Sequence, residues 1–327
     1  MSAAAHTTGA TPRVLITRPL PAPVLDGARE FADLVVREET APMRAAEMVA
    51  ALEKFDAIVP TLGDNFSAEI LARADPLRCR LLANFGVGYN HLDVLAAAAL
   101  DIAVSNTPGA VTDATADLAM TLILMTARRA GEGERLLRSG GWAGWHPTQL
   151  LGLHVTGKRL GVIGMGRIGQ AIARRAHLGF GMEVSYWNRS AKDPGFPARR
   201  MPTLEALAAH VDVLVLALPG GAETRHLVGT SCFAAMPEHA IFVNIARGDI
   251  VDETALIDAL AAGEIAGAGL DVYEHEPDVP EALTGMENVT LLPHLGTNAL
   301  EVRVDMGLMA VENIRSFFAG KGLVNPV

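Results

Sequence analysis

A glycine-rich turn between a buried strand and a helix constrains the fold of this chain more than any other feature. The apolar run 160–163 leads into Gly164-Met165-Gly166-Arg167-Ile168-Gly169, and helical patterning begins directly afterwards. In such a turn the first glycine allows a tight bend, the second lets a pyrophosphate approach the backbone, and the third lets the helix pack closely on the strand. The helix N-terminus adds amide hydrogens and the positive end of its dipole. The turn therefore predicts dinucleotide binding by Gly164, Gly166, Arg167, Ile168 and Gly169.

Short apolar segments alternate with helical stretches on both sides of this turn. Before it, we expect strands at residues 13–17, 57–60, 81–84 and 102–105. From the strand of the turn onwards, we expect strands at residues 160–163, 183–187, 213–216, 240–244, 267–270 and 289–292. One long helix is expected from about Thr115 to Ser139, and a last helix around residues 301–318 should pack back on the first half of the chain. Such alternation is typical of doubly wound parallel sheets.

The alternation predicts an α/β protein with two doubly wound domains. A Rossmann dinucleotide-binding domain of residues 109–298 is expected as an insertion in a flavodoxin-like substrate (catalytic) domain, which residues 13–108 and 299–327 would form. At 327 residues the chain is long for one domain and sufficient for two. Residues 1–12 are mostly small and polar, and we expect them to form a disordered tail.

Composition excludes several classes of partner. The net charge of −10 argues against binding to nucleic acid or to anionic membrane surfaces, because both are negatively charged and bind positively charged protein surfaces. No apolar run reaches the ~18–20 residues of a membrane span, and the first eleven residues lack the pattern of a signal peptide. Cys79 and Cys232 have no nearby cysteine partner, so free thiols in a reducing cytoplasm are expected. The histidines are too scattered to suggest a metal site.

The end of the second strand after the turn indicates which dinucleotide is bound. An acidic residue about 20 positions past the glycines would bind the ribose 2′-hydroxyl of NAD(H) and repel a 2′-phosphate. The sequence there is Trp187-Asn188-Arg189-Ser190, which has no carboxylate. Asn188, Arg189 and Ser190 could bind a phosphate instead, with Arg189 using its charged fork of donors. This favours NADP(H), although NAD(H) stays possible and Arg189 could be an ordinary exposed arginine.

Three polar residues follow strands of the second series. Arg247 comes shortly after strand 240–244, Glu276 after strand 267–270, and His294 after strand 289–292. Ligands bind at the carboxyl edge of open α/β sheets, and all three residues are expected at that edge. Each alone could be a surface ion pair, a turn carboxylate or a capping histidine. Together, beside a dinucleotide-binding turn, they indicate a catalytic site.

These motifs resemble the D-2-hydroxyacid dehydrogenase family over essentially the full chain after its first dozen residues. The matching segments are Asn84-Phe85-Gly86-Val87-Gly88, the turn from Gly164 to Gly169, Ala246-Arg247-Gly248, Leu270-Asp271-Val272-Tyr273-Glu274-His275-Glu276-Pro277, and Pro293-His294-Leu295-Gly296. Within the family, Gly141-Trp142-Ala143-Gly144-Trp145-His146-Pro147 and the pair Asn188-Arg189 look most like glyoxylate/hydroxypyruvate reductases.

The resemblance implies NAD(P)H-dependent reduction of a small 2-keto acid to the D-2-hydroxy acid. His294, as imidazolium, would supply the proton, since imidazole titrates near neutral pH. Glu276 would hold the ring of His294 and favour its charged form. Arg247 would bind the substrate carboxylate and polarise the keto oxygen. The amides of Val87 and Gly88 would also bind the carboxylate.

Further positions follow from the resemblance alone. It implies that the cofactor is also contacted by Thr115, Leu218, Pro219, Thr224, Ile245, Ala246, Asp271, His294 and Gly296. Trp142 or Trp145 would reach the substrate site of a neighbouring subunit, or would simply pack in an interface. A two-fold homodimer would use the long helix after Thr115 and segment 142–153, unless that segment is buried within one chain.

Three alternatives stay open at this stage. A phosphoglycerate-type dehydrogenase would need additional basic residues for a phosphate, and none is evident. A larger 2-keto acid, such as phenylpyruvate or a keto-sugar acid, would also suit the motifs, because the width of the pocket cannot be deduced from the sequence. A dinucleotide-sensing interaction protein, like the corepressor relatives of the family, would carry similar residues.

Overall fold

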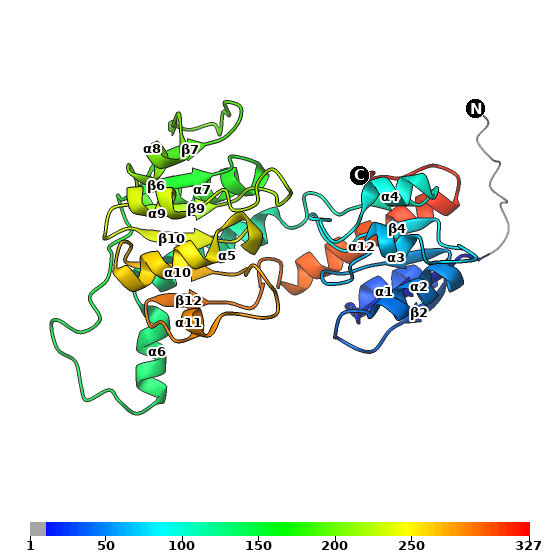
Figure 1. Cartoon of the computed structure of the whole chain (residues 1–327), viewed down its shortest axis with the longest axis horizontal. Coiled ribbons are helices and arrows are strands. Elements are labelled where there is room, and N and C mark those ends of the chain that lie inside the picture. The colour runs from blue at the N-terminus through cyan, green and yellow to red at the C-terminus, as the bar shows by residue number, and fades with distance from the viewer. Residues whose placement is uncertain (1–10) are drawn as a thin grey trace. The chain divides into compact units, whose positions relative to one another are not determined.

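Two compact α/β units make up the protein (Figure 1). The computed structural model describes residues 11–327, so the first ten residues of the expected tail lie outside the described residues. Residues up to Val111 together with Asn298–Val327 form one unit, which we call the substrate unit, and Thr112–Thr297 form the other, the cofactor unit. Each unit contains one wholly parallel sheet, which confirms the predicted fold class.

The sheet of the substrate unit has five parallel strands in the order β2-β1-β3-β4-β5, which is the flavodoxin-like order. The strands are β1 (Arg13–Ile16), β2 (Asp33–Val36), β3 (Ala57–Val59), β4 (Leu81–Ala83) and β5 (Ala103–Ser105). The helices are α1 (Ala22–Arg29), α2 (Ala45–Lys54), α3 (Ala68–Leu71), α4 (Val94–Ala99) and α12 (Leu300–Phe318). Val24, Ala28 and Val311 pack α12 against α1, as expected for a last helix that returns to the first half of the chain.

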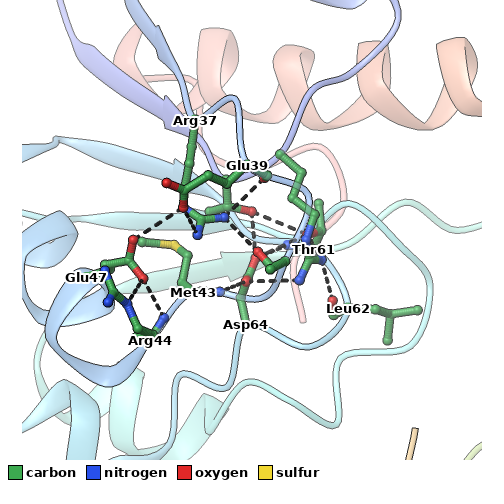
Figure 2. Close-up of polar contacts among 11 residues, drawn as sticks. Arg37, Glu39, Met43, Arg44, Glu47, Thr61, Leu62 and Asp64 are labelled. Carbon is green, nitrogen blue, oxygen red and sulfur yellow. Dashed lines mark hydrogen bonds and ion pairs between the residues drawn. The ribbon is translucent and has the colours of Figure 1, made fainter. Parts of the chain in front are cut away.

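A buried carboxylate ties together three loops at the carboxyl edge of this sheet (Figure 2). Asp64 is fully buried and accepts hydrogen bonds from Thr17 Oγ1 at 2.6 Å, Met43 N at 2.9 Å and Thr61 N at 3.0 Å. The guanidinium of Arg18 lies 3.5 Å from Asp64 Oδ1 and also donates to Thr61 Oγ1. The carboxylate thus satisfies donors that would otherwise be buried without partners, which fixes the loops after β1, β2 and β3.

The sheet of the cofactor unit has seven parallel strands in the order β12-β11-β10-β9-β6-β7-β8. They are β6 (Arg159–Ile163), β7 (Glu183–Trp187), β8 (Ala198–Arg200), β9 (Val213–Leu216), β10 (Ile241–Asn244), β11 (Gly267–Leu270) and β12 (Val289–Leu291). The chain runs outward from β6 in both directions, so the strand order reverses beside β6. Dinucleotides bind at such a reversal.

Helices cover both faces of this second sheet. They are α5 (Thr112–Ala127), α6 (Ala130–Arg138), α7 (Arg167–Phe180), α8 (Leu204–Ala208), α9 (Thr230–Ala235), the 3-10 helix η1 (Gly248–Ile250), α10 (Glu253–Ala262) and α11 (Glu281–Thr284). Along β9, Val213 and Val215 join the core with α5 and α7, whereas Leu214 and Leu216 join the core with α8, α9 and α10. This alternation follows from the two-residue period of a strand, and it explains why β9 is apolar throughout.

The single helix predicted from Thr115 to Ser139 is wrong, because the structure has two helices there. Helix α5 ends at Ala127, and Arg129 adopts a left-handed conformation with φ of +52° before α6 begins. The chain that returns towards β6 packs on this end, where Leu153 N donates to Ala127 O at 2.7 Å. A tertiary contact therefore outweighs the helical propensity of the sequence.

Two edge strands, β2 and β8, were not predicted. Neither contains a fully buried residue: β2 begins with the exposed Asp33, and β8 ends with the exposed Arg199 and Arg200. Their sequences consequently lack the apolar run by which the central strands are recognised.

Within residues 11–327, every helix is too short or too polar to cross a bilayer.

Candidate active site

The glycine turn lies between β6 and α7 in the cofactor unit. Gly164 has φ of +98° and its amide donates to Trp187 O at 2.9 Å. A Cβ atom on Gly169 would lie 2.0 Å from Gly164 O, so only glycine lets the helix approach the turn this closely. A Cβ atom on Gly166 would meet nothing within 4 Å, which leaves open space over the turn.

The start of α7 suits an anionic group. Gly166 is the N-cap residue, and no side chain caps the helix, so within the described chain the amides of Arg167 and Ile168 have no acceptor. Such amides and the helix dipole bind phosphate. Met165 N donates to Asn188 Oδ1 at 3.2 Å, which couples the turn to the end of β7. The geometry of this turn therefore fits the pyrophosphate of a nicotinamide dinucleotide.

The turn after β7 contains the residues predicted to select NADP(H). Arg189 is highly exposed, and its guanidinium lies 3.4 Å from the equally exposed carboxylate of Glu223. Asn188 Nδ2 donates to Ser190 O at 2.9 Å. Arg200, on β8, donates to the carbonyls of Asn188 and Arg189. Two side chains thus hold the turn in one conformation.

Three adjacent strands place Arg247, Glu276 and His294 at the carboxyl edge of the same sheet. They follow β10, β11 and β12, which are neighbours in the sheet. His294 Nδ1 lies 2.8 Å from Glu276 Oε2, and Tyr273 N donates to Glu276 Oε1 at 3.1 Å. The hydrogen bond at Nδ1 orients the ring and leaves Nε2 for a substrate.

The charges in this group influence one another. Burial by itself raises the pKa of Glu276. Its partners outweigh this effect and bring the pKa below its usual range: the hydrogen bond and charge of His294, the Tyr273 amide and the charge of Arg247. Burial lowers the pKa of the Arg247 guanidinium, and the charges of Glu276 and Asp249 oppose this effect. Glu276 is therefore ionised, and its carboxylate is a hydrogen-bond acceptor beside His294 Nδ1.

Asp271 holds the loop that contains His294. Its buried carboxylate accepts Leu295 N at 2.6 Å through Oδ1 and Gly296 N at 2.9 Å through Oδ2, and its carbonyl accepts His294 N at 2.9 Å. His294 has φ of +54°, a conformation that side chains other than glycine rarely adopt. The carboxylate compensates for this strain, a role that the sequence does not indicate, because the motif suggests only a cofactor contact.

The remaining predicted cofactor positions line the same edge or lie just below it. Thr115, Ile245 and Ala246 are buried, and a Cβ atom on Gly296 would lie 3.6 Å from the Thr115 side chain. In the loop after β9, Leu218 packs against Gly164, and the Thr224 hydroxyl lies 3.1 Å from Pro219 O and from Gly221 O. Contact of these residues with a cofactor stays a prediction.

In the substrate unit, asparagine side chains shape the loop after β4. Asn84 Nδ2 donates to Gly86 O at 2.9 Å and to Gly88 O at 3.0 Å, and Asn106 Nδ2 donates to Val87 O at 2.8 Å. Within residues 11–327 the amides of Val87 and Gly88 donate no hydrogen bond. Two N–H groups are consequently available to an anionic ligand, although the roles of Asn84 and Asn106 were not predicted.

The structure does not bring the predicted tryptophans to Arg247, Glu276 or His294. Trp142 and Trp145 are 49% and 79% exposed on an irregular segment after α6. In Figure 1, α6 and this segment extend away from the sheet of their own unit. Trp142 Nε1 donates to Gln149 Oε1 at 3.3 Å within the segment.

Residues 11–327 contain no group of three or more His, Cys, Asp or Glu side chains arranged to hold a metal ion.

Gly248 provides a test of how the site is assembled. A Cβ atom there would lie 1.8 Å from Tyr273 C and 2.0 Å from Tyr273 O, in the segment that leads to Glu276. We expect Gly248→Ala to lower the free energy of unfolding by about 3 kcal/mol, because the backbone must shift. Gly179→Ala is the control: its Cβ would meet nothing within 4 Å, and a change below about 1 kcal/mol is expected in the helix. Urea unfolding measures both, and equal effects would contradict the close approach.

Comparisons with known proteins agree with this geometry. Residues 120–296 match the family model described as D-isomer specific 2-hydroxyacid dehydrogenase, NAD binding domain. The chain is 42% identical to the glyoxylate reductase of Thermococcus gammatolerans over 317 residues, which cover 95% of this chain and 94% of that protein. It is 36% identical to the glycerate dehydrogenase of Hyphomicrobium methylovorum over 312 residues, or 94% and 96% of the two chains.

A solved structure extends the likeness to three dimensions. The NADPH-dependent glyoxylate/hydroxypyruvate reductase of Sinorhizobium meliloti, in complex with NADP and malonate, aligns with a TM-score of 0.86 and 36% identity over 97% of each chain. The family resemblance seen in the sequence motifs is thus confirmed over both units. This chain belongs to the D-isomer specific 2-hydroxyacid dehydrogenase family, and it is therefore a nicotinamide-dependent oxidoreductase.

Proposed function

We propose that this protein reduces glyoxylate, hydroxypyruvate or a similar small 2-keto acid to the D-2-hydroxy acid, with NADPH preferred over NADH. The observation that carries the proposal is the 2.8 Å hydrogen bond between His294 Nδ1 and Glu276 Oε2, formed in the same unit as the glycine turn. Relatives named glyoxylate reductase, at about 40% identity over nearly the whole chain, support the substrate class.

The proposed residues divide the work of a carbonyl reduction. When bound, the reduced nicotinamide supplies a hydride for the carbonyl carbon. His294 Nε2 gives its proton to the carbonyl oxygen, and the Glu276 carboxylate at Nδ1 holds the ring in position for this transfer. Arg247 offers its guanidinium to the carboxylate and to the oxygen on which negative charge develops. One hydride and one proton convert the keto acid into the hydroxy acid.

Binding of the substrate carboxylate is proposed for two further groups. The free amides of Val87 and Gly88 are directed by the asparagines that occupy the neighbouring carbonyls, so they need no rearrangement to accept an anion. Preorganised donors of this kind stabilise charge better than mobile side chains, because reorganisation is avoided. Two free amides of this kind suit one carboxylate group.

His294 is tested by replacement with glutamine. We expect the wild-type protein to oxidise NADPH with glyoxylate or hydroxypyruvate, and we expect His294→Gln to lower kcat by a factor on the order of 10² or more, because glutamine cannot supply the proton. NADPH affinity, measured by fluorescence titration, should stay close to the wild-type value.

A second histidine–carboxylate pair provides the matched control for this variant. His239 Nε2 lies 2.8 Å from Asp212 Oδ1, beside the amino ends of β9 and β10. His239→Gln should leave kcat unchanged. Unchanged turnover in His294→Gln would remove that residue as the acid, and a wild-type protein inactive on every small 2-keto acid would contradict the enzymatic function itself.

The preference for NADPH is tested at Arg189. Its side chain is highly exposed and, within residues 11–327, pairs only with the equally exposed Glu223, so it is available to a 2′-phosphate. Arg189→Ala should raise KM for NADPH about tenfold, the loss expected for one hydrogen-bonded charge, while KM for NADH changes little. Initial rates with both cofactors measure this, and an equal change in the two KM values would contradict a phosphate contact.

A homodimer is proposed for the cofactor unit. A shallow hollow lies between α5 and α7, lined by apolar residues such as Met120, Leu124 and the exposed Leu178. None of its lining residues belongs to the glycine turn or to the Arg247 group. This hollow and the exposed Trp142 and Trp145 are apolar surface of the kind that a second copy covers. Sedimentation equilibrium should give twice the monomer mass, and a monomer at micromolar concentration would contradict the proposal.

A cytoplasmic location is proposed from the two cysteines. Cys79 and Cys232 are free and buried, and burial raises the pKa of each thiol to about 12. Thiols of this kind are unreactive and are typical of proteins in reducing compartments.

A further inference from the structure

We propose that Arg200 is a positioning residue for the 2′-phosphate of NADP(H), because it turns two backbone amides of the turn 188–190 towards the phosphate. The inference rests on the proposed NADPH preference and adds to it a residue from outside the sequence motif. Arg200 lies on β8, the edge strand next to β7, in register with Tyr186.

The guanidinium of Arg200 bridges two successive carbonyl groups. Arg200 Nε donates to Asn188 O at 3.2 Å, and Arg200 Nη2 donates to Arg189 O at 2.8 Å. A planar guanidinium with fixed donors can hold two acceptors at once, whereas a lysine ammonium is a single point of charge. Arg200 therefore fixes two peptide groups of the turn in one orientation.

The orientation of these peptide groups determines where their amides point. In a trans peptide the N–H is directed opposite to the C=O. With the carbonyls of Asn188 and Arg189 directed at Arg200, the N–H groups of Arg189 and Ser190 point away from it. Within the described residues neither amide donates a hydrogen bond. Unpaired, parallel amides of this kind form concave sites for anions.

Asn188 holds the turn from its other side. Its Oδ1 accepts Met165 N from the glycine turn at 3.2 Å, and its Nδ2 donates to Ser190 O at 2.9 Å. The carbonyls of residues 188, 189 and 190 are thus all occupied by side chains. The turn consequently offers the amides of Arg189 and Ser190 on the side that faces away from Arg200, and it also carries the exposed Arg189 guanidinium.

A 2′-phosphate matches this set of groups in charge and in donors. The Arg189 side chain is 87% exposed and, among the residues that the structure describes, is paired only with the equally exposed Glu223, so by itself it is a mobile ligand. Amides that are already held in place lose little conformational entropy when they bind a phosphate. Their contribution to the binding free energy therefore depends on the side chain that holds them. The role of Arg200 is therefore to preserve the amide geometry, and NADH, which lacks the phosphate, should not depend on it.

The test compares adenosine 2′,5′-bisphosphate with 5′-AMP as ligands, measured by isothermal titration calorimetry without turnover. We expect Arg200→Ala to weaken binding of the bisphosphate about tenfold, as expected when hydrogen bonds to a charged group lose their alignment. Binding of 5′-AMP should change less than about twofold, since it lacks the group in question. Arg200→Lys should give an intermediate loss, because one ammonium can hold only one of the two carbonyls.

Arg199 provides the matched control. It is the neighbouring exposed arginine of β8, and within the described residues its side chain makes no hydrogen bond or ion pair. Arg199→Ala removes the same charge from the same strand and should leave the affinity for both ligands close to that of the wild type. Thermal unfolding shows whether each variant is folded, and Arg200→Lys replaces Arg200→Ala in the comparison if the alanine variant is not.

The outcomes distinguish the role of Arg200 from the NADPH preference on which it rests. A wild-type protein that binds the bisphosphate no better than 5′-AMP overturns both. A wild-type preference that Arg189→Ala abolishes and Arg200→Ala leaves intact overturns the role of Arg200 alone. An equal loss for both ligands in Arg200→Ala, or an equal loss in Arg199→Ala, also overturns it, since the effect would then be one of stability or of net charge.

Discussion

The proposed catalytic group of Arg247, Glu276 and His294 depends on the hydrogen bonds that the Asp271 carboxylate accepts from the amides of Leu295 and Gly296. They hold His294 at φ of +54°, a backbone conformation that costs about 1–2 kcal/mol for a residue with a side chain. A buried carboxylate receiving two amides can offset that cost, since hydrogen bonds to charged groups are stronger than neutral ones. With the loop fixed, Nδ1 of His294 meets Glu276, and Nε2 is left to act.

The same physical device recurs where ligands are proposed to bind. Side chains occupy backbone carbonyls in a turn, and the amides on the opposite side are left without partners. Asn84 and Asn106 do this for the turn 86–88, and Arg200 with Asn188 does it for the turn 188–190. Because a trans peptide fixes N–H opposite to C=O, an exposed anion-binding amide can be specified by a side chain that never touches the anion.

Sequence reasoning finds the central strands and places Arg247, Glu276 and His294 at one edge of the sheet, but it does not find the features that tertiary contacts determine. The glycine turn and the apolar runs predict β6 and its neighbours, because buried parallel strands need apolar residues on both faces. The edge strands β2 and β8 carry exposed polar residues, so no pattern distinguishes them, and with β8 the position of Arg200 is missed as well. The break at Arg129 arises from the returning Leu153 segment, a contact between residues that the local sequence cannot report.

The pKa values of two carboxylates beside His294, those of Asp271 and Glu276, are shifted in opposite directions, and the difference lies in their partners. Burial is the largest influence on both. The pKa of Asp271 is raised, because burial and the charge of Glu276 raise it more than the other groups lower it. The groups that lower it are the amides of Leu295 and Gly296 and the charge of His294. For Glu276 the bond to His294 and the charges of His294 and Arg247 outweigh burial, so the pKa is lowered. A lowered pKa in the folded protein means that ionised Glu276 contributes to stability above the ordinary glutamate pKa of about 4.3, and that this contribution is lost as pH falls through the lower folded value. Near neutral pH Glu276 is therefore ionised, so the carboxylate that is proposed to orient His294 also contributes to the stability of the site.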